Sequence, residues 1–502
     1  MSIIAQRPAR SGRIPEFGLL LLAFTISLTA WLLVTQGTTD AASSPWSRNF
    51  ILGASIAALG LFAAHLLIRK LAPWADPIIF PVAVTLNGIG LAMIHRIDYD
   101  LPGRTEVGSQ LILTGGGIIL MLLTLFLLRD HRRLRQFTYT SLLLGIALLL
   151  LPLTPGIGKE IYGARLWISL AGFSFQPAEL AKICFVIFFA GYLVVQRDNL
   201  ALAGKKLFGL QFPQLRHAAP ILIAWLAGLA ILAFEKDFGT ALLFFGLFVA
   251  MLYLATERIS WIVIGGLLSS IGVWFIIQIM PHIQARITVW LHAFDQQVYD
   301  SPYGSYQLVQ GWFGLASGGL LGTGWGKGYP TMSFASNSDF IIASLGEELG
   351  LVGLIAILCL YLLFIFRAFN IGLHLRDGFG KLLAGGFGFA IALQCFVVVG
   401  GVTRVIPLTG LAMPFLALGG SALISNWIIV GILLRMSSDA RRPYKPATTP
   451  LSQLNTSDLT PLLEKSGKAA DVVNADSAAD SAADFAADSP DADSHPTEVV
   501  HL

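Results

Sequence analysis

The sequence is poor in the residues on which soluble and secreted proteins depend. Only 13% of its 502 residues are Asp, Glu, Lys or Arg, while 55% are apolar, and this balance disfavours a water-soluble globular fold. Its three cysteines, Cys184, Cys359 and Cys395, all lie inside apolar runs and indicate neither a disulfide framework nor a metal site. No Gly-Lys-Ser/Thr motif closes its densest glycine segment, so those glycines do not indicate a nucleotide-binding loop.

What the sequence has in abundance is apolar runs of about 17–28 residues, and about 20 residues suffice to cross a bilayer as a helix. The runs lack the alternating polarity of a membrane β-barrel. The sequence therefore predicts an all-α polytopic membrane protein with about twelve transmembrane helices. The first run is full length and follows no short cleavable signal pattern, so we expect it to remain as an anchor. The predicted spans are 17–36, 50–68, 77–95, 108–128, 137–154, 177–195, 218–234, 239–255, 260–280, 339–366, 382–403 and 410–434.

The distribution of basic residues predicts the orientation. With the N-terminus in the cytoplasm, 21 Lys and Arg up to residue 445 fall in cytoplasmic segments and nine in outer loops. A ratio above two to one fits the positive-inside rule. Both termini are then cytoplasmic, and the basic inner loops indicate anionic lipid rather than nucleic acid as their partner.

This topology divides the chain into three parts. Residues 1–16 form a cytoplasmic N-terminus, residues 17–436 form the transmembrane domain, and residues 437–502 form a tail rich in Ala, Asp, Ser and Pro. That tail composition cannot bury a core, so we expect disorder there. Within the membrane domain, the long polar segment 281–338 faces outward, and loops of such length are usually functional or disordered.

Ionisable residues gather near the outer ends of the predicted spans. Pro177 suits the first turn of a helix, and Glu179 and Lys182, three residues apart, share one face of it. Intramembrane charges are costly and mark functional sites by default. An internal ion pair that locks two helices together explains this pair equally well.

Further charges lie on the same predicted side. Lys236 and Asp237 occupy a tight turn, which a solvated turn would also explain, and Asp339 precedes a span that carries the adjacent acids Glu347 and Glu348. Two adjacent acids inside lipid require partners.

We expect Arg165, Lys236 and Arg404, with Lys182, to surround one outer-leaflet cavity, and Asp300 and Asp339 to lie beside it. Cations next to a carboxylate at lipid depth suit a phosphorylated lipid substrate. Taken alone, Asp300 would be read as an ordinary exposed carboxylate.

In these motifs the chain resembles the SEDS family of polytopic proteins, which includes the RodA, FtsW and SpoVE types. The resemblance covers residues 162–435 and appears nearest the actinobacterial RodA type. It rests on five groups in order: Arg165 with Gln176-Pro177-Ala-Glu179 and Lys182; Lys236-Asp237-Phe-Gly239-Thr240; Asp300 with Gly304 and Tyr306-Gln307; Ser338-Asp339-Phe340 with Gly346-Glu347-Glu348; and Pro407 with Gly410, Pro414 and Gly419-Gly420-Ser421.

The resemblance implies an inverting peptidoglycan glycosyltransferase that polymerises lipid II at the outer face of the bacterial cytoplasmic membrane. It also implies a class B penicillin-binding protein as partner. Asp300 is the expected catalytic base by its spacing from Gln307, although spacing from Trp290 points to Asp295 instead. A divalent cation, Mg²⁺ or Mn²⁺, could assist, but no ligand set is evident. The substrate-binding residues expected are Arg165, Glu179, Lys182, Lys236, Asp237, Gln307, Asp339 and Arg404.

Three alternatives remain open at the level of sequence. Twelve spans around charged residues would also suit a transporter that flips a lipid-linked precursor. A non-catalytic scaffold for a transpeptidase would tolerate loss of Asp300. Within the family, a role in division rather than elongation is the third alternative.

Overall fold

The predicted helical membrane fold is confirmed. The computed structural model describes residues 13–38, 48–101, 103–161, 164–170, 173–201, 206–207, 210–211, 215–301 and 304–443. Every predicted span falls on a helix: α1 (Arg13–Thr38), α2 (Arg48–Leu71), α3 (Ile79–Asp100), α4 (Glu106–Leu127), α5 (Thr138–Leu150), α6 (Pro177–Ala201), α7 (Leu215–Glu235), α8 (Phe238–Thr256), α9 (Ser260–Ile279), α13 (Ile341–His374), α14 (Gly378–Val402) and α15 (Gly420–Arg441).

Eleven stretches among the described residues are long and apolar enough to span a membrane, and α7 adds the shorter apolar stretch Trp225–Glu235. The chain divides into the units Met1–Arg442 and Pro443–Leu502. The predicted disordered tail lies almost wholly outside the described residues. Its predicted start at residue 437 is too early, because α15 continues to Arg441. Most of the predicted N-terminal segment 1–16 also lies outside them.

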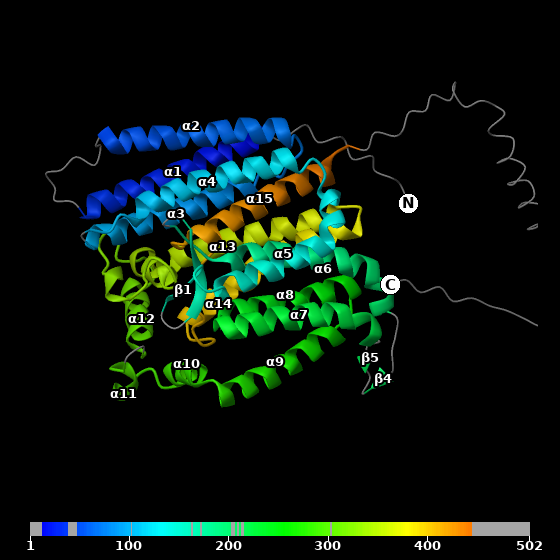
Figure 1. Ribbon diagram of the computed structural model, residues 1–502. Coiled ribbons are helices and arrows are strands. Elements are labelled where there is room, and N and C mark those ends of the chain that lie inside the picture. The colour runs from blue at the N-terminus through cyan, green and yellow to red at the C-terminus, as the bar shows by residue number, and fades with distance from the viewer. Residues whose placement is uncertain are drawn as a thin grey trace, which may run out of the picture. The chain divides into compact units, whose positions relative to one another are not determined.

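The helices pack as a central group within a shell. Most of α3, α6, α14 and α15 is buried, whereas α2 and α9 expose most of their apolar side chains. Figure 1 shows the long helices side by side, with α9 inclined away from α7 and α8. Exposed apolar helix faces are what lipid requires.

The outward segment predicted as a loop is largely helical. It contains α10 (Pro281–Leu291), α11 (Gln296–Tyr299), α12 (Tyr306–Gly318) and the 3₁₀ helix η3 (Pro330–Met332). Figure 1 shows α10, α11 and α12 together at one end of the bundle. We call this the loop end; α6, α8, α13 and α15 all begin there. The opposite end, which carries Arg69, Arg132, Arg135, Arg367 and Arg441, is called the basic end.

Two small sheets and two further 3₁₀ helices were not predicted. β1 (Gly158–Ile161), β2 (Ala164–Leu170) and β3 (Phe173–Phe175) form an antiparallel sheet in the order β1-β2-β3 between α5 and α6. β4 (Lys206–Leu207) pairs with β5 (Leu210–Gln211). The 3₁₀ helices are η1 (His131–Phe137), which leads into α5, and η2 (Leu151–Leu153), which follows it.

The last span begins ten residues later than predicted. Residues 410–419 are as apolar as a segment of a transmembrane helix. Their backbone is nevertheless irregular, and Gly410 has a φ of +78°. Side chains from three spans satisfy its carbonyl groups: Asn87 donates to Phe415 O at 3.0 Å, Gln110 to Ala417 O at 3.2 Å and Gln394 to Ala412 O at 2.9 Å. Non-helical backbone at membrane depth is tolerated only with such internal partners.

The adjacent acids of α13 have the partners that the sequence required. Arg96 Nε donates to Glu348 Oε1 at 2.9 Å, and the other Glu348 oxygen accepts from the Gly326 amide at 3.0 Å. Glu347 Oε1 accepts from the Tyr329 amide at 2.8 Å. These bonds attach the glycine-dense segment that follows α12 to the first turns of α13.

Gly350 allows this attachment, because α13 is interrupted there with a φ of +69°. A Cβ atom at this position would lie 2.3 Å from Gly322 N and 2.6 Å from Leu320 O. We predict that Gly350→Ala lowers the free energy of unfolding by about 2–3 kcal/mol, since both strain and backbone overlap oppose it. Thermal unfolding of the detergent-solubilised protein measures this.

Gly60→Ala is the matched control. Gly60 lies within α2 and a Cβ atom there would meet nothing within 4 Å. In a helix interior this change stabilises by about 0.5–1 kcal/mol. An equal, small effect of both substitutions would contradict the assigned role of Gly350.

Candidate functional site

A buried charge pair lies in the centre of the bundle near the loop end. Lys182 Nζ donates to Glu179 Oε2 at 2.8 Å within α6 and to Gln394 Oε1 of α14 at 3.0 Å. Ser425 of α15 donates to the same Glu179 oxygen at 3.2 Å. The side chain of Lys182 is only 1% exposed, so these contacts compensate its charge. The group locks three central helices together and also places a carboxylate beside the next cluster.

Asp237 connects this pair to the turn between α7 and α8. Its carboxylate caps α8 by accepting from the Thr240 amide at 2.9 Å and from Thr240 Oγ1 at 2.6 Å, as N-cap aspartates do. Gln176 Nε2 donates at 3.3 Å to Asp237 Oδ2, the same oxygen that accepts from Thr240 Oγ1. Burial raises the pKa of Asp237, and the Thr240 hydrogen bonds offset only part of that effect.

Arg286 of α10 supplies the positive charge that faces this carboxylate. Its guanidinium lies 3.4 Å from Leu408 O and 3.3 Å from Thr409 O. Its charge opposes the effect of burial on both Asp237 and Asp339. Even so, burial raises the pKa of Asp339 to about 6. Three segments far apart in the sequence therefore bring two carboxyl groups within electrostatic range of one guanidinium, without a direct ion pair among these described residues.

This arrangement, which we call the carboxylate–arginine cluster (Asp237, Arg286 and Asp339), has the properties of a proton-transfer and anion-binding site. A carboxyl group with a pKa near 6 can exchange protons at physiological pH. A guanidinium matches phosphate oxygens with paired donors. Perturbed carboxyl groups beside a cation are typical of functional sites, although structural networks also produce them.

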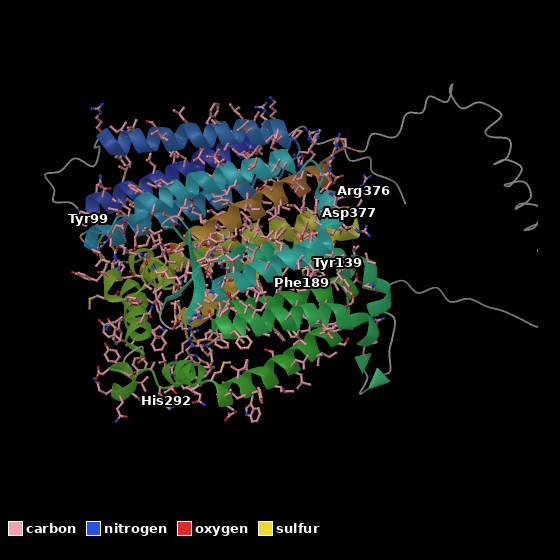
Figure 2. The ribbon with its side chains drawn as sticks, in the orientation of Figure 1. Tyr99, Tyr139, Phe189, His292, Arg376 and Asp377 are labelled. Atoms are coloured by element: carbon pink, nitrogen blue, oxygen red, sulfur yellow. The ribbon has the colours of Figure 1, made fainter. Side chains whose placement is uncertain are left out.

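Asp300, the expected catalytic base, does not contact this cluster. It lies at the end of α11, is exposed, and accepts a hydrogen bond from Gln296 Nε2 at 2.7 Å. Asp300 forms no ion pair with any residue of the described part of the chain. Asp295, the alternative, is also exposed, 3.4 Å from His292 Nδ1. Figure 2 shows His292 among these outer helices.

The other predicted site residues have varied positions. Arg165 of β2 is exposed and pairs with Glu160 at 3.0 Å. Lys236 is exposed in the turn that precedes α8. Gln307 Nε2 donates to Phe334 O at 2.7 Å, which ties α12 to the segment before α13.

Arg404 is engaged with the backbone. It donates to Trp290 O at 3.0 Å and to Leu291 O at 2.9 Å, while Trp290 Nε1 donates to Arg404 O at 3.0 Å. Its guanidinium also lies 5.3 Å from the ring centre of Trp312. These contacts fasten the end of α10 to the turn after α14. Glu179 thus pairs with Lys182 and interacts electrostatically with Asp237, while Asp237 and Asp339 each interact electrostatically with Arg286. Arg165, Arg404 and Asp300 make no contact with these groups among the described residues, and the shared cavity stays a prediction.

The sequence analysis missed Arg286, Gln394 and Ser425 as site residues. Gln394 could have been recognised in the sequence, because it is a polar amide inside an otherwise apolar run, and polar residues within membrane spans often mark functional sites. Arg286 appeared only as one basic residue of the outward segment, and nothing in the local sequence relates it to Asp237 or Asp339.

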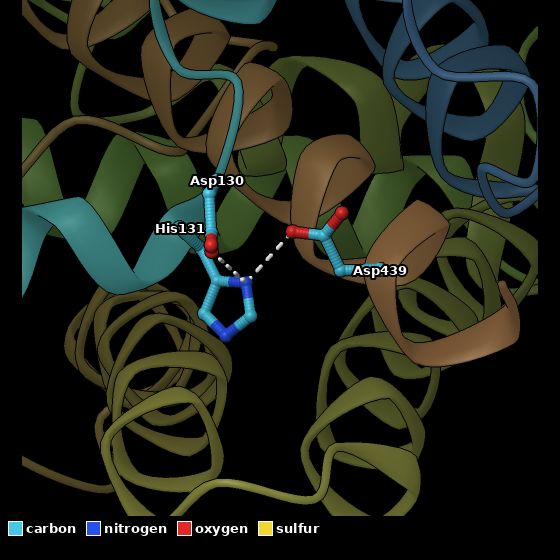
Figure 3. Close-up of side chains that lie close together, drawn as sticks. All are labelled: Asp130, His131 and Asp439. Carbon is cyan, nitrogen blue, oxygen red and sulfur yellow. Dashed lines mark hydrogen bonds and ion pairs between the residues drawn. The ribbon is translucent and has the colours of Figure 1, made fainter. Parts of the chain in front are cut away.

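A different charged group lies at the basic end, where Asp130, His131 and Asp439 have potential ligand atoms within 4.8 Å of one another. Figure 3 shows His131 between the two aspartates. Its Nδ1 lies 2.8 Å from Asp439, and its Nε2 lies 2.9 Å from Asp377. Both contacts are hydrogen bonds only for the doubly protonated ring, which has no lone pair for a metal.

This group therefore acts as an ion-paired clamp between η1, α14 and α15. Burial alone would raise the pKa of Asp377, but hydrogen bonds from His131 and the Gly380 amide lower it to about 2. The Asp377 carboxylate thus remains charged over the physiological range.

Comparison with known proteins supplies the family. The FtsW/RodA/SpoVE family model, described as "Cell cycle protein", matches residues 78–442. The chain belongs to this family. It is 44% identical over 438 residues to the peptidoglycan glycosyltransferase RodA of Mycobacterium tuberculosis, covering 85% of this chain and 91% of that one. The RodA of Mycobacterium leprae is 41% identical, covering 87% and 94%.

Solved structures of the same fold support the architecture. A peptidoglycan synthase complex, described for its coordination of polymerization and crosslinking, matches with a TM-score of 0.59 and 23% identity over 74% of this chain and 99% of that one. The rod shape determining protein RodA of Thermus thermophilus matches with a TM-score of 0.50 and 24% identity over 74% and 98%. Helices α1 and α2 of this FtsW/RodA/SpoVE protein precede the family match.

The buried pair generates a stability prediction. Lys182→Met leaves the Glu179 carboxylate buried without its cation, which costs about 3–5 kcal/mol of unfolding free energy. Combining it with Glu179→Gln removes the unpaired charge, so the double variant should recover much of the loss. Thermal unfolding in detergent compares them. A double variant less stable than Lys182→Met would contradict this account.

Asp339 generates a pH prediction. Because its pKa rises from 3.8 to about 6 on folding, the folded state holds a proton in this window that the unfolded chain releases. The free energy of unfolding should therefore fall as the pH rises from about 4 to 6, by about 1.4 kcal/mol per unit of pKa shift. Asp339→Asn should flatten this slope, whereas Asp295→Asn at an exposed carboxylate should not. Equal slopes in both variants would refute the assignment.

Proposed function

We propose that this protein polymerises lipid II into glycan strands at the outer face of the bacterial cytoplasmic membrane, in support of cell elongation. The observation that carries the proposal is the electrostatic interaction of Arg286 with the carboxyl groups of Asp237 and Asp339 at the loop end, in a chain 44% identical to a peptidoglycan glycosyltransferase. Family membership supplies the reaction class, and the cluster supplies the chemistry for a phosphorylated lipid.

The proposed reaction joins the GlcNAc 4-hydroxyl of one lipid II to the anomeric carbon of the growing chain. The new C–O bond forms as the bond to undecaprenyl pyrophosphate breaks, so the configuration inverts from α to β. The hydroxyl proton passes to a carboxylate, and the departing pyrophosphate takes the bonding electrons. Two groups are therefore needed: a base at the attacking oxygen and positive charge at the leaving group.

Arg286 and Lys236 are the proposed ligands of the pyrophosphate. The exposed Arg165 is proposed to attract the phosphorylated headgroup as it enters the site. Positive charge aimed at a developing anion lowers the barrier because it stabilises the transition state more than the substrate. Lys182 and Arg404 are proposed to act indirectly, by positioning neighbouring groups. Lys182 donates to Glu179, and Arg404 donates to backbone carbonyls. Asp237 and Asp339 stabilise the charge of Arg286 electrostatically, and Gln307 ties α12 to the segment before α13.

Asp300 is proposed as the general base. Its exposed position on α11 allows it to approach a lipid headgroup bound over the carboxylate–arginine cluster. Catalytic hydrogen bonds often form only in the substrate complex, so the separation in the free protein is compatible with this role.

A divalent cation, Mg²⁺ or Mn²⁺, is proposed to be held mainly by the substrate phosphates. Magnesium is commonly bound by one or two carboxylates together with phosphates and water. Asp237 and Asp339 offer such carboxylates, but the described residues of the loop end bring no group of three acidic, His or Cys ligands together.

The orientation and the partner are part of the proposal. The surplus of Lys and Arg at the basic end favours the cytoplasm for that end, which directs α10, α11 and α12 to the outside. A class B penicillin-binding protein is the proposed partner, supported by the fold match to a peptidoglycan synthase complex.

Substitution of Asp300 tests the proposal. Asp300→Asn should reduce glycan polymerisation by at least about 10²–10⁴-fold, the usual contribution of a general base, with no change in thermal unfolding. Purified protein given lipid II and a class B penicillin-binding protein provides the assay, with glycan strands resolved on gels.

Asp295→Asn, five residues away and equally exposed, is the matched control and should retain activity. Loss with Asp295→Asn alone would transfer the base role to that residue. Full activity in both variants would overturn carboxylate catalysis from α11, and movement of lipid II across the bilayer without strands would favour a transporter.

A further inference from the structure

The basic end contains a cavity that the glycosyltransferase proposal does not use. Its volume is about 220 Å³, and it lies between the η1–α5 segment and the last turns of α6. The polar side chains that line it include Arg135, Gln136, Tyr139, Tyr192 and Gln196. Figure 2 shows Tyr139 at this end of the bundle, with Arg376 and Asp377, far from Tyr99 at the other.

Close packing of two helices forms the floor of the cavity. At Gly191 of α6, an added Cβ atom would lie 2.0 Å from Thr138 Oγ1, so the helices touch without an intervening side chain. Thr138 in turn donates to Arg135 O at 2.6 Å, which fixes the end of η1. The cavity lies at this contact, where Thr138 and Gly191 line it together with the longer side chains around them.

Of the described residues that line the cavity, Arg135 alone carries a formal charge, and that charge is positive. η1 carries three arginines. Arg132 lies 3.5 Å from Asp377, whereas neither Arg133 nor Arg135 forms an ion pair within the described ranges. Among the described residues, no carboxylate therefore occupies the guanidinium of Arg135.

We propose that this cavity binds the phosphodiester headgroup of an anionic phospholipid. The cavity lies where two spans end, which is the depth of lipid headgroups, and tyrosines are typical of that depth. Guanidinium pairs with phosphate oxygens through two parallel hydrogen bonds, and basic pockets between transmembrane helices bind anionic headgroups elsewhere.

The surface beside the cavity fits the rest of such a lipid. Leu143 and Leu144 of α5 are 71% and 54% exposed, one turn beyond Tyr139. An acyl chain can therefore follow α5 while the headgroup stays at Arg135. The site lies at the end opposite the carboxylate–arginine cluster and does not depend on the proposed enzymatic role.

Lipid binding to the full-length chain in mild detergent tests this inference. Native mass spectrometry during titration with phosphatidylglycerol, and separately with phosphatidylcholine, counts the bound lipids. We expect tight binding of one phosphatidylglycerol and at least tenfold weaker binding of phosphatidylcholine. Arg135→Gln should weaken phosphatidylglycerol binding at least tenfold, and Arg135→Lys should weaken it less.

Arg133→Gln is the matched control, because it removes the same charge from the same short helix without touching the cavity. It should change binding less than twofold, and all variants should match the parent in thermal unfolding. Equal losses in Arg133→Gln and Arg135→Gln would overturn the site in favour of general surface charge. Displacement of the lipid by millimolar inorganic phosphate would also overturn it, since the pocket would then be a free-phosphate site.

Discussion

The buried ammonium of Lys182 constrains the centre of this protein more than any other group. A charge at this depth is stable only with compensation from several directions, and it obtains this from Glu179 on its own helix and Gln394 on α14. Gln394 then uses its amide nitrogen to bind Ala412 O, in the irregular segment before α15. One desolvated charge thus determines how three helices pack and where the last span can begin.

The irregular segment links this constraint to the loop end. Its preceding turn offers the carbonyls of Leu408 and Thr409 to Arg286, which in turn faces Asp237 and Asp339. The position of Asp237 therefore follows from its role as a helix cap, and that of Arg286 from hydrogen bonds to two backbone carbonyls. Preorganised charge of this kind is what a transfer from a pyrophosphate-linked donor needs.

Hydropathy was enough to predict the spans, because a membrane-spanning helix needs about 20 apolar residues and many different apolar sequences meet this need. The Glu179–Lys182 pair could also be predicted from the sequence, since a spacing of three residues places both side chains on one helix face. The start of α15 was predictable only in part. Pro414 and Gly419 disfavour a helix within the apolar run 410–419, but the partners Asn87, Gln110 and Gln394, which stabilise the irregular backbone, come from distant spans. Arg286 and the backbone contacts of Arg404 likewise depend on packing between distant segments, on which local sequence carries no information.

The separation between Asp300 and the carboxylate–arginine cluster has a physical rationale. A polymerase of this kind must accept two bulky lipid headgroups and release a pyrophosphate, so a base fixed beside the leaving-group site would obstruct exchange. Charges that stabilise the leaving group can be held rigidly by the bundle, since that position is the same in every cycle. The proposed base, Asp300, need act only when an acceptor is present, and its place on the short helix α11, outside the packed spans, would let headgroup binding complete the site.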